Sequence, residues 1–146
     1  MPNALEKIEF QNELLAVIIR SEARTQGVKF HTPDEFSQQI ASIGHPKGKI
    51  IPPHVHNEVL REVVFTKEVL IIKQGKLRVD FYDNDQKYLE SRILFKGDII
   101  LLAKGGHGFE VLEDLEMVEV KQGPYAGEQD KTRFVPVATS QLIIKD

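Results

Sequence analysis

Residues 68–82 read Glu-Val-Leu-Ile-Ile-Lys-Gln-Gly-Lys-Leu-Arg-Val-Asp-Phe-Tyr, and this stretch decides the fold class. Its first half is rich in valine, leucine and isoleucine, and its second half alternates Leu77, Val79 and Phe81 with more polar neighbours. Both patterns are typical of strands, because successive side chains of a strand point to opposite faces of the sheet. Gly75 separates the halves, so we expect two strands that part at this glycine.

The same pattern continues outward in both directions, as short apolar or alternating runs separated by turn residues. Glu113 and Asp114 predict a hairpin turn, and residues 123–133 predict a polar surface loop. The remaining expected strands are residues 14–19, 38–43, 88–95, 99–103, 108–112, 115–122, 134–137 and 142–144. Many short strands with short turns predict an all-β sandwich or small barrel with little helix.

Length and composition narrow the class of protein. The chain has 146 residues, which predicts a single domain over residues 1–146. Hydrophobic residues at 41% and charged residues at 28% exclude a disordered or collagen-like chain. A formal net charge of −3 gives no reason to expect nucleic acid as a partner, and the lack of cysteine excludes disulfides and zinc–sulfur sites.

The lengths of the apolar runs indicate whether we expect the chain to cross a membrane. The longest, such as residues 14–19 and 99–103, are far shorter than the ~20 residues that span a bilayer. Residues 1–7 carry both acidic and basic side chains and lead into no secretory signal. We therefore expect a cytoplasmic protein with no membrane partner.

Three of the five histidines suggest chemistry. His54 and His56 are two residues apart, so on a strand both rings would leave the same face, a good arrangement for holding one metal ion. Pro52 and Pro53 precede them and suit a strand entered from a loop. His107 lies far away in sequence, at the start of another expected strand and between two glycines.

These residues resemble the first motif of the cupin superfamily, in which a glycine, His-x-His, a glutamate and a second glycine follow one another at fixed spacing. Gly48 and the two histidines fit its front half, and Glu68 and Gly75 fit its back half. Eleven residues separate His56 from Glu68, where cupins have three or four, which a longer loop would explain. Glu58 and Glu62 lie in that loop and are alternatives to Glu68 as the carboxylate ligand.

Residues 97–107, Gly-Asp-Ile-Ile-Leu-Leu-Ala-Lys-Gly-Gly-His, resemble the second cupin motif. Ala103 stands where proline is usual, one residue rather than two separates Gly105 from His107, and Val111 replaces a common asparagine. The resemblance implies a double-stranded β-helix, or jelly-roll barrel. Its motif-bearing core would be residues 48–120, with N-terminal strands in residues 9–45 and closing strands in residues 123–146.

The resemblance also implies a metal centre. His54, His56, Glu68 and His107 would bind one divalent transition metal, and zinc, iron(II), manganese, nickel and copper all suit three nitrogens and one oxygen. Open positions on the ion would make the site catalytic. The alternative to a metal centre is that these side chains are ordinary surface residues of strands and turns.

Several functions are compatible with such a site. We favour a metal-assisted isomerase or epimerase of a small carbohydrate-like substrate, with Glu62, Glu119 or Lys121 as acid, base or substrate anchor. Glu119 and Lys121 would share the face of His107 if residues 115–122 pair with the strand of His107. The alternatives are a non-catalytic metal or small-ligand binder, a metal-dependent dioxygenase, and a metal-free sugar-nucleotide epimerase with a histidine base. We also expect a homodimer, with residues 14–19 as a candidate edge strand.

Overall fold

The computed structural model describes residues 3–146, and it confirms the all-β expectation. Within these residues the helical elements are two short 3-10 helices, η1 (Gly127–Asp130) and η2 (Thr139–Gln141). No helix of the described chain is long and apolar enough to span a membrane. The chain divides into two compact units, one comprising the chain up to Ala23 together with Thr66–Asp146, the other Arg24–Phe65.

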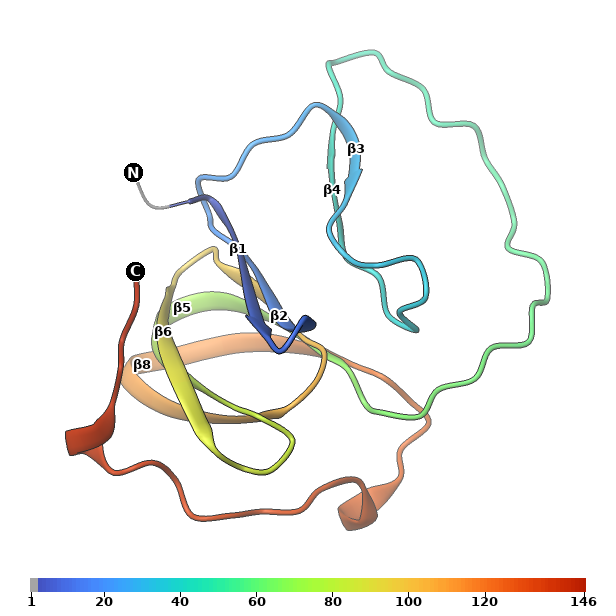
Figure 1. The fold of residues 1–146 in the computed structure, drawn as a ribbon. Coiled ribbons are helices and arrows are strands. Elements are labelled where there is room, and N and C mark those ends of the chain that lie inside the picture. The colour runs from blue at the N-terminus through green and yellow to red at the C-terminus, as the bar shows by residue number, and fades with distance from the viewer. Residues whose placement is uncertain (1–2) are drawn as a thin grey trace. The chain divides into compact units, whose positions relative to one another are not determined.

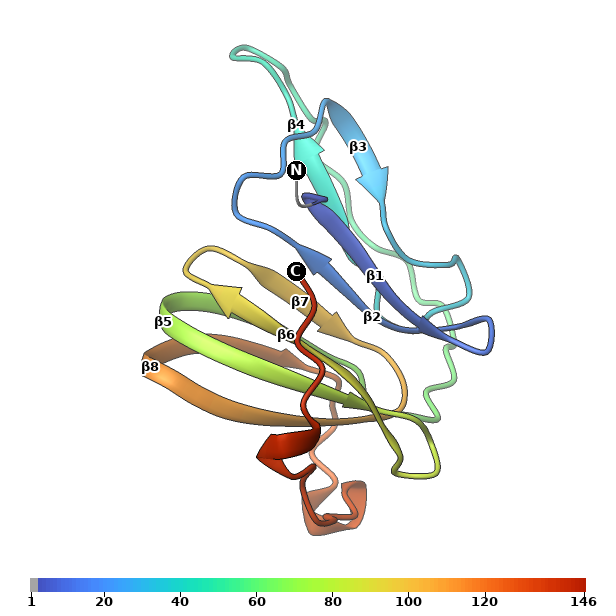
Figure 2. The same cartoon turned by 60° about the vertical axis from the view of Figure 1, so that its left-hand side comes forward.

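The first unit is one strongly curled antiparallel sheet (Figures 1 and 2). Its strands run in the order β1-β2-β7-β5-β6, and β8 pairs with β5 outside this path. The strands are β1 (Leu5–Phe10), β2 (Glu13–Ile19), β5 (Glu68–Tyr82), β6 (Tyr88–Phe95), β7 (Ile99–Leu102) and β8 (Gly106–Lys121). Strands β5 and β8 form a long two-stranded ribbon that curves through the unit (Figure 1).

The expected strand break at Gly75 is wrong, because β5 is continuous across it. The pairing of β5 with β8 shifts register at several bulges between Ile72 and Leu77. Gly75 has φ +88°, and a Cβ there would lie 2.1 Å from the carbonyl oxygen of Asp114. Bulges and a left-handed glycine bend a strand while its ladder continues on both sides. The glycine is therefore the bend of the ribbon.

The expected hairpin at Glu113 and Asp114 is wrong for the same reason. Residues 106–121 form one strand that pairs with β5 along its length, and the two acidic residues lie opposite the bend at Gly75. Residues 115–122 therefore do not fold back on the strand of His107. Turn-forming residues mark a change of direction, but the partner strand decides whether the ladder stops there.

Other expectations also need correction. Residues 14–19 do form a strand within β2, but β2 pairs with β1 on one side and β7 on the other, so this run is no free edge. Residues 134–137 form no strand, and of residues 142–144 only Ile144 makes a bridge, to Ser91 of β6.

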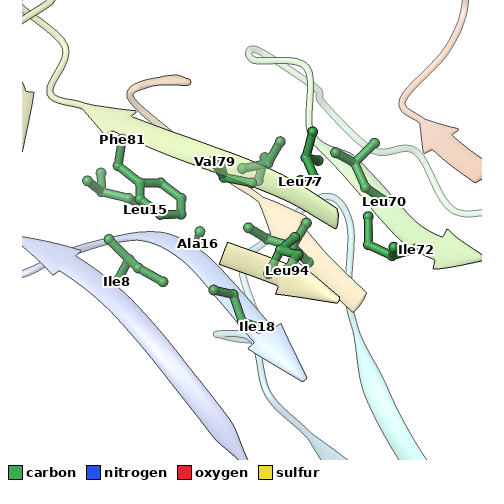
Figure 3. Close-up of a cluster of buried hydrophobic side chains, with 12 residues drawn as sticks. Ile8, Leu15, Ala16, Ile18, Leu70, Ile72, Leu77, Val79, Phe81 and Leu94 are labelled. Atoms are coloured by element: carbon green, nitrogen blue, oxygen red, sulfur yellow. The ribbon is translucent and has the colours of Figure 1, made fainter. Parts of the chain in front are cut away.

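The core lies between β1 and β2 on one side and the curled β5–β6 portion on the other (Figure 3). The inward positions of β5 alternate, as the sequence pattern predicts. Each large apolar side chain buried here contributes about 1.5–3 kcal/mol. The fully buried members include Ile8, Ile18, Leu70, Leu77, Val79 and Leu94.

Asp98, part of the glycine–aspartate pair of the second motif, has a structural role. Its side chain is buried and accepts hydrogen bonds from the backbone N–H of Ser21 and of Phe95, each 2.9 Å long. Arg20 donates to the same carboxylate at 2.9 Å and to Glu6 at 2.8 Å. This network holds the turn before β7 in place.

The second unit contains a short hairpin of β3 (Gly27–Phe30) and β4 (Ala41–Gly44). Strand β4 overlaps the end of the expected strand 38–43, whereas β3 was not expected. His31 lies 2.8 Å from the hydroxyl of Ser42. Residues 49–64 have no regular secondary structure, so the expected strand around His54 and His56 is absent. Pro52 and Pro53 lack the N–H that a strand ladder needs, which accounts for part of this.

Candidate functional site

The curl of the β5–β8 ribbon creates the candidate site. Glu68 begins β5 and lies opposite Lys121, the last residue of β8, while His107 lies opposite Phe81, thirteen residues further along β5. In a straight strand thirteen residues span about 43 Å. In the curled ribbon His107 Nε2 lies 3.4 Å from Glu68 Oε2. The bend therefore brings the two ends of the ribbon together.

Four side chains form this cluster, which we call the Glu68 cluster: Glu68, His107, Lys121 and Asp130. Lys121 Nζ lies 3.6 Å from Glu68 Oε1 and 3.7 Å from Asp130 Oδ2. The hydroxyl of Thr66 donates a hydrogen bond to the other oxygen of Asp130. Glu68 is 7% exposed, whereas the side chains of His107 and Lys121 are about 30% exposed. A buried carboxylate thus supports two groups that a small molecule can reach.

The charges of the cluster stabilise one another. The hydrogen bond with His107 lowers the pKa of Glu68, burial opposes this, and the charges of His107, Lys121 and Lys131 lower it further. Partial burial by itself lowers the pKa of Lys121, but the carboxylates of Glu68, Asp130 and Glu119 outweigh it and raise the pKa. At neutral pH the cluster therefore holds the carboxylate of Glu68 between the side chain of His107 and the ammonium group of Lys121.

The surroundings of His107 fix its position. A Cβ at Gly106 would lie 2.8 Å from the ring of Phe134 and 3.1 Å from the Cβ of Tyr82. Phe134 packs edge-on against Tyr82, whose hydroxyl accepts a hydrogen bond of 2.9 Å from the backbone N–H of Val137. The C-terminal segment thus closes over the glycine before His107. This contact explains why the residue before the histidine is glycine.

An aromatic ring lies next to the histidine. The Phe109 ring is tilted against that of His107, with centroids 5.4 Å apart, and remains 41% exposed. Glu119 is exposed, lies opposite Leu70, and its charge acts on Lys121. The exposed groups that join the cluster are therefore an apolar ring beside His107 and a second carboxylate whose charge acts on Lys121.

The other residues predicted for the site belong to the second unit. His54 and His56 are exposed, and their rings make an edge-on pair with centroids 5.3 Å apart. His54 Nδ1 lies 3.1 Å from the carbonyl oxygen of Pro52. Glu58 and Glu62 are exposed in the same irregular segment. The structure thus presents the predicted ligands as two pairs, one in each unit, and their convergence stays a prediction.

The number and type of donor atoms in the Glu68 cluster decide how well it fits the predicted metal. Glu68 and His107 bring one carboxylate oxygen and one imidazole nitrogen together, a combination that suits zinc, iron, manganese, nickel or copper. Within residues 3–146, no three His, Cys, Asp or Glu side chains come together as a metal-binding group. Two donors are fewer than the three or more protein ligands of usual transition-metal sites.

Sequence reasoning missed three contributors to this site: Asp130, Thr66 and Phe134. Asp130 and Phe134 lie in or beside the polar stretch after β8, where no local pattern marks a side chain that folds back onto a strand.

Comparison with protein-family models, with curated proteins and with solved structures finds no match for this chain. Its own motif residues and geometry therefore carry the functional conclusion.

Proposed function

We propose that this chain is a small cupin that isomerises or epimerises a carbohydrate-like substrate at the Glu68 cluster. The observation that carries the proposal is the position of His107 Nε2, 3.4 Å from the buried carboxylate of Glu68, beside the ammonium group of Lys121. The curled antiparallel sheet is compatible with a jelly-roll barrel, and the glycine, histidine and glutamate motifs favour the cupin family.

His107 acts as the base. In the tautomer whose Nε2–H donates to Glu68, the ring carries its lone pair on Nδ1, and this nitrogen removes a proton from the carbon next to a substrate carbonyl. The electron pair moves to the carbonyl oxygen and forms an enolate. Glu68 holds the ring in this tautomer and stabilises the imidazolium that results, as a carboxylate does for a catalytic histidine. Glu68 is thus a positioning residue.

Lys121 stabilises the enolate. Its raised pKa keeps the amine protonated, so it offers hydrogen bonds and positive charge to the developing oxyanion rather than serving as a base. A proton delivered by water to the opposite face of the same carbon gives an epimer, and His107 then loses its own proton to solvent. In an α-hydroxy carbonyl substrate, His107 can instead return the proton to the former carbonyl carbon while the adjacent hydroxyl proton passes to the enolate oxygen, which gives an isomer. The exposed ring of Phe109 provides an apolar surface for the C–H face of a sugar.

Proton abstraction is testable without knowledge of the product. We would incubate the protein in D2O with a panel of keto sugars and 4-keto or 3-keto sugar nucleotides, and follow loss of the α-proton signal by NMR. Wild-type protein is expected to exchange at least one substrate. The variant His107→Gln is expected to lose about 100-fold or more of that rate, in line with the loss of a general base.

A matched control is His45→Gln, which removes a histidine of the second unit outside both predicted pairs. It is expected to leave exchange unchanged. Exchange that persists in His107→Gln, or the lack of exchange with every member of the panel, would contradict the proposal.

A metal-dependent form of the same function is the second candidate, favoured by the donor pair of Glu68 and His107. A bound divalent ion would polarise the substrate carbonyl. Elemental analysis of untagged protein, with His54→Ala and Glu68→Ala beside the wild type, separates the two forms. About one equivalent of metal that both variants lose supports the four-ligand site, whereas exchange by protein without metal supports His107 as the base.

A further inference from the structure

The segment that follows β8, residues 123–133, is fastened to its unit by one side chain. It contains η1, which has no buried residue and no side-chain cap, and apart from Gly127 all its residues are exposed. Within residues 3–146, the hydrogen bonds and ion pairs that join this segment to the rest of the unit are those of Asp130, to the hydroxyl of Thr66 and to the ammonium group of Lys121. A segment without buried side chains opens at a low free energy.

The fastening group lies on the ammonium group that the proposed function uses. Lys121 Nζ lies 3.7 Å from Asp130 Oδ2 and 3.6 Å from Glu68 Oε1. Both distances exceed the ~2.7–2.9 Å of a tight hydrogen bond between an ammonium group and a carboxylate. Since the ammonium group has three N–H donors, it can make a shorter contact with a better placed oxyanion. The side chains of Lys121 and Asp130 are 29% and 21% exposed, so a small ligand reaches the pair from solvent.

The charges around Lys121 show what the release of Asp130 changes. The carboxylates whose charges act on Lys121 are, in decreasing order, those of Glu68, Asp130 and the exposed Glu119. Lys131 follows Asp130 in the chain, and its positive charge acts on Glu68. An anion that approaches Lys121 is repelled by the Asp130 carboxylate, because like charges a few ångströms apart repel each other strongly. Once Asp130 withdraws, that repulsion is removed and both lysines attract the anion.

We propose that Asp130 is an autoinhibitory occupant of Lys121, which an oxyanion of the ligand displaces, and that this displacement releases residues 123–133. Thr66 holds Asp130 in the inhibitory position through its hydroxyl. The inference rests on the proposed function only for the identity of the oxyanion, the enolate oxygen of the substrate. The displacement itself depends on charge and position, so another small oxyanion also produces it.

Inorganic phosphate is the probe, titrated into untagged protein at constant ionic strength and followed by the NMR shifts of the backbone amides. The Lys121 amide is expected to shift, and the order parameters of residues 123–133 are expected to fall as phosphate binds. Asp130→Asn is expected to bind phosphate about five-fold more tightly than wild type and to loosen the segment without phosphate. Thr66→Val, which changes no charge, is expected to tighten binding about two-fold. Lys121→Gln is expected to lose the binding.

Glu128→Gln is the matched control. It removes the same charge from the same 3-10 helix, and the charge of Lys121 acts on Glu128 too, but the ion-pair partner of Glu128 is Arg133, outside the Glu68 cluster. It is expected to change phosphate affinity less than two-fold and to leave the segment ordered.

Three results would overturn the proposal. They are phosphate binding by Asp130→Asn that is no tighter than that by Glu128→Gln, a segment that keeps its order in Asp130→Asn, and binding that persists in Lys121→Gln. Neither readout requires turnover, so a lack of deuterium exchange with every substrate would contradict the proposed function alone.

Discussion

Gly75→Ala tests whether the bend of the β5–β8 ribbon depends on glycine. The new side chain has two costs. A non-glycine residue at φ +88° costs about 1–2 kcal/mol. A Cβ placed 2.1 Å from the Asp114 carbonyl oxygen forces the two strands apart, and loss of two ladder hydrogen bonds adds about 2 kcal/mol. The total is about 3–4 kcal/mol.

Urea unfolding of wild type and variant, followed by circular dichroism, measures this difference. At about 2–4 °C per kcal/mol for a chain of this size, the midpoint of thermal unfolding falls by roughly 10 °C. Gly127→Ala is the matched control, because Gly127 belongs to the same unit and has φ +72°, but no atom lies within 4 Å of its Cβ position. A loss in Gly75→Ala no larger than that in Gly127→Ala would refute the clash as the cause.

Three further predictions concern stability. The pKa of Glu68 is lower in the folded than in the unfolded protein. Its contribution to the free energy of unfolding is therefore present above about pH 4.5 and is lost as the pH falls through the folded pKa. The stability difference between wild type and Glu68→Gln, measured by urea unfolding of metal-free protein, should shrink below pH 4.5. Asp98→Ala should cost about 3–5 kcal/mol in the same assay, because it leaves Arg20 and two backbone N–H groups without their buried acceptor, and a loss under 1 kcal/mol would contradict that role. Tyr88→Phe should cost about 1 kcal/mol and speed hydrogen exchange at the Ile143 amide, whose N–H donates to the Tyr88 hydroxyl; unchanged exchange would show that this bond is not formed in solution.

The sequence predicts the local elements of this fold better than their connections. Strands β6 and β7 follow from runs of alternating or apolar residues bounded by Lys96 and Gly97. Gly75 and Asp114 also stand out as interruptions, but a bend and a turn have the same local signal. The pairing of residues about forty positions apart in the chain decides between them, and no short-range pattern contains that information.

The candidate site was predictable in part. Glu68 and His107 follow from the resemblance to cupin motifs, and the structure brings them within 3.4 Å of each other. Lys121 was a candidate on the assumption of a hairpin that does not exist, and it reaches Glu68 through the β5–β8 register instead. Asp130 joins the cluster from η1, a position that depends on how the chain folds back after β8.

The most direct test of the central claim is a double-mutant cycle on the rate of substrate deuterium exchange. If Glu68 acts through His107, Glu68→Gln slows exchange in the wild-type background and has no further effect in the His107→Gln background. The account predicts this non-additive result. Equal slowing by Glu68→Gln in both backgrounds would show that the two side chains act independently, and would contradict it.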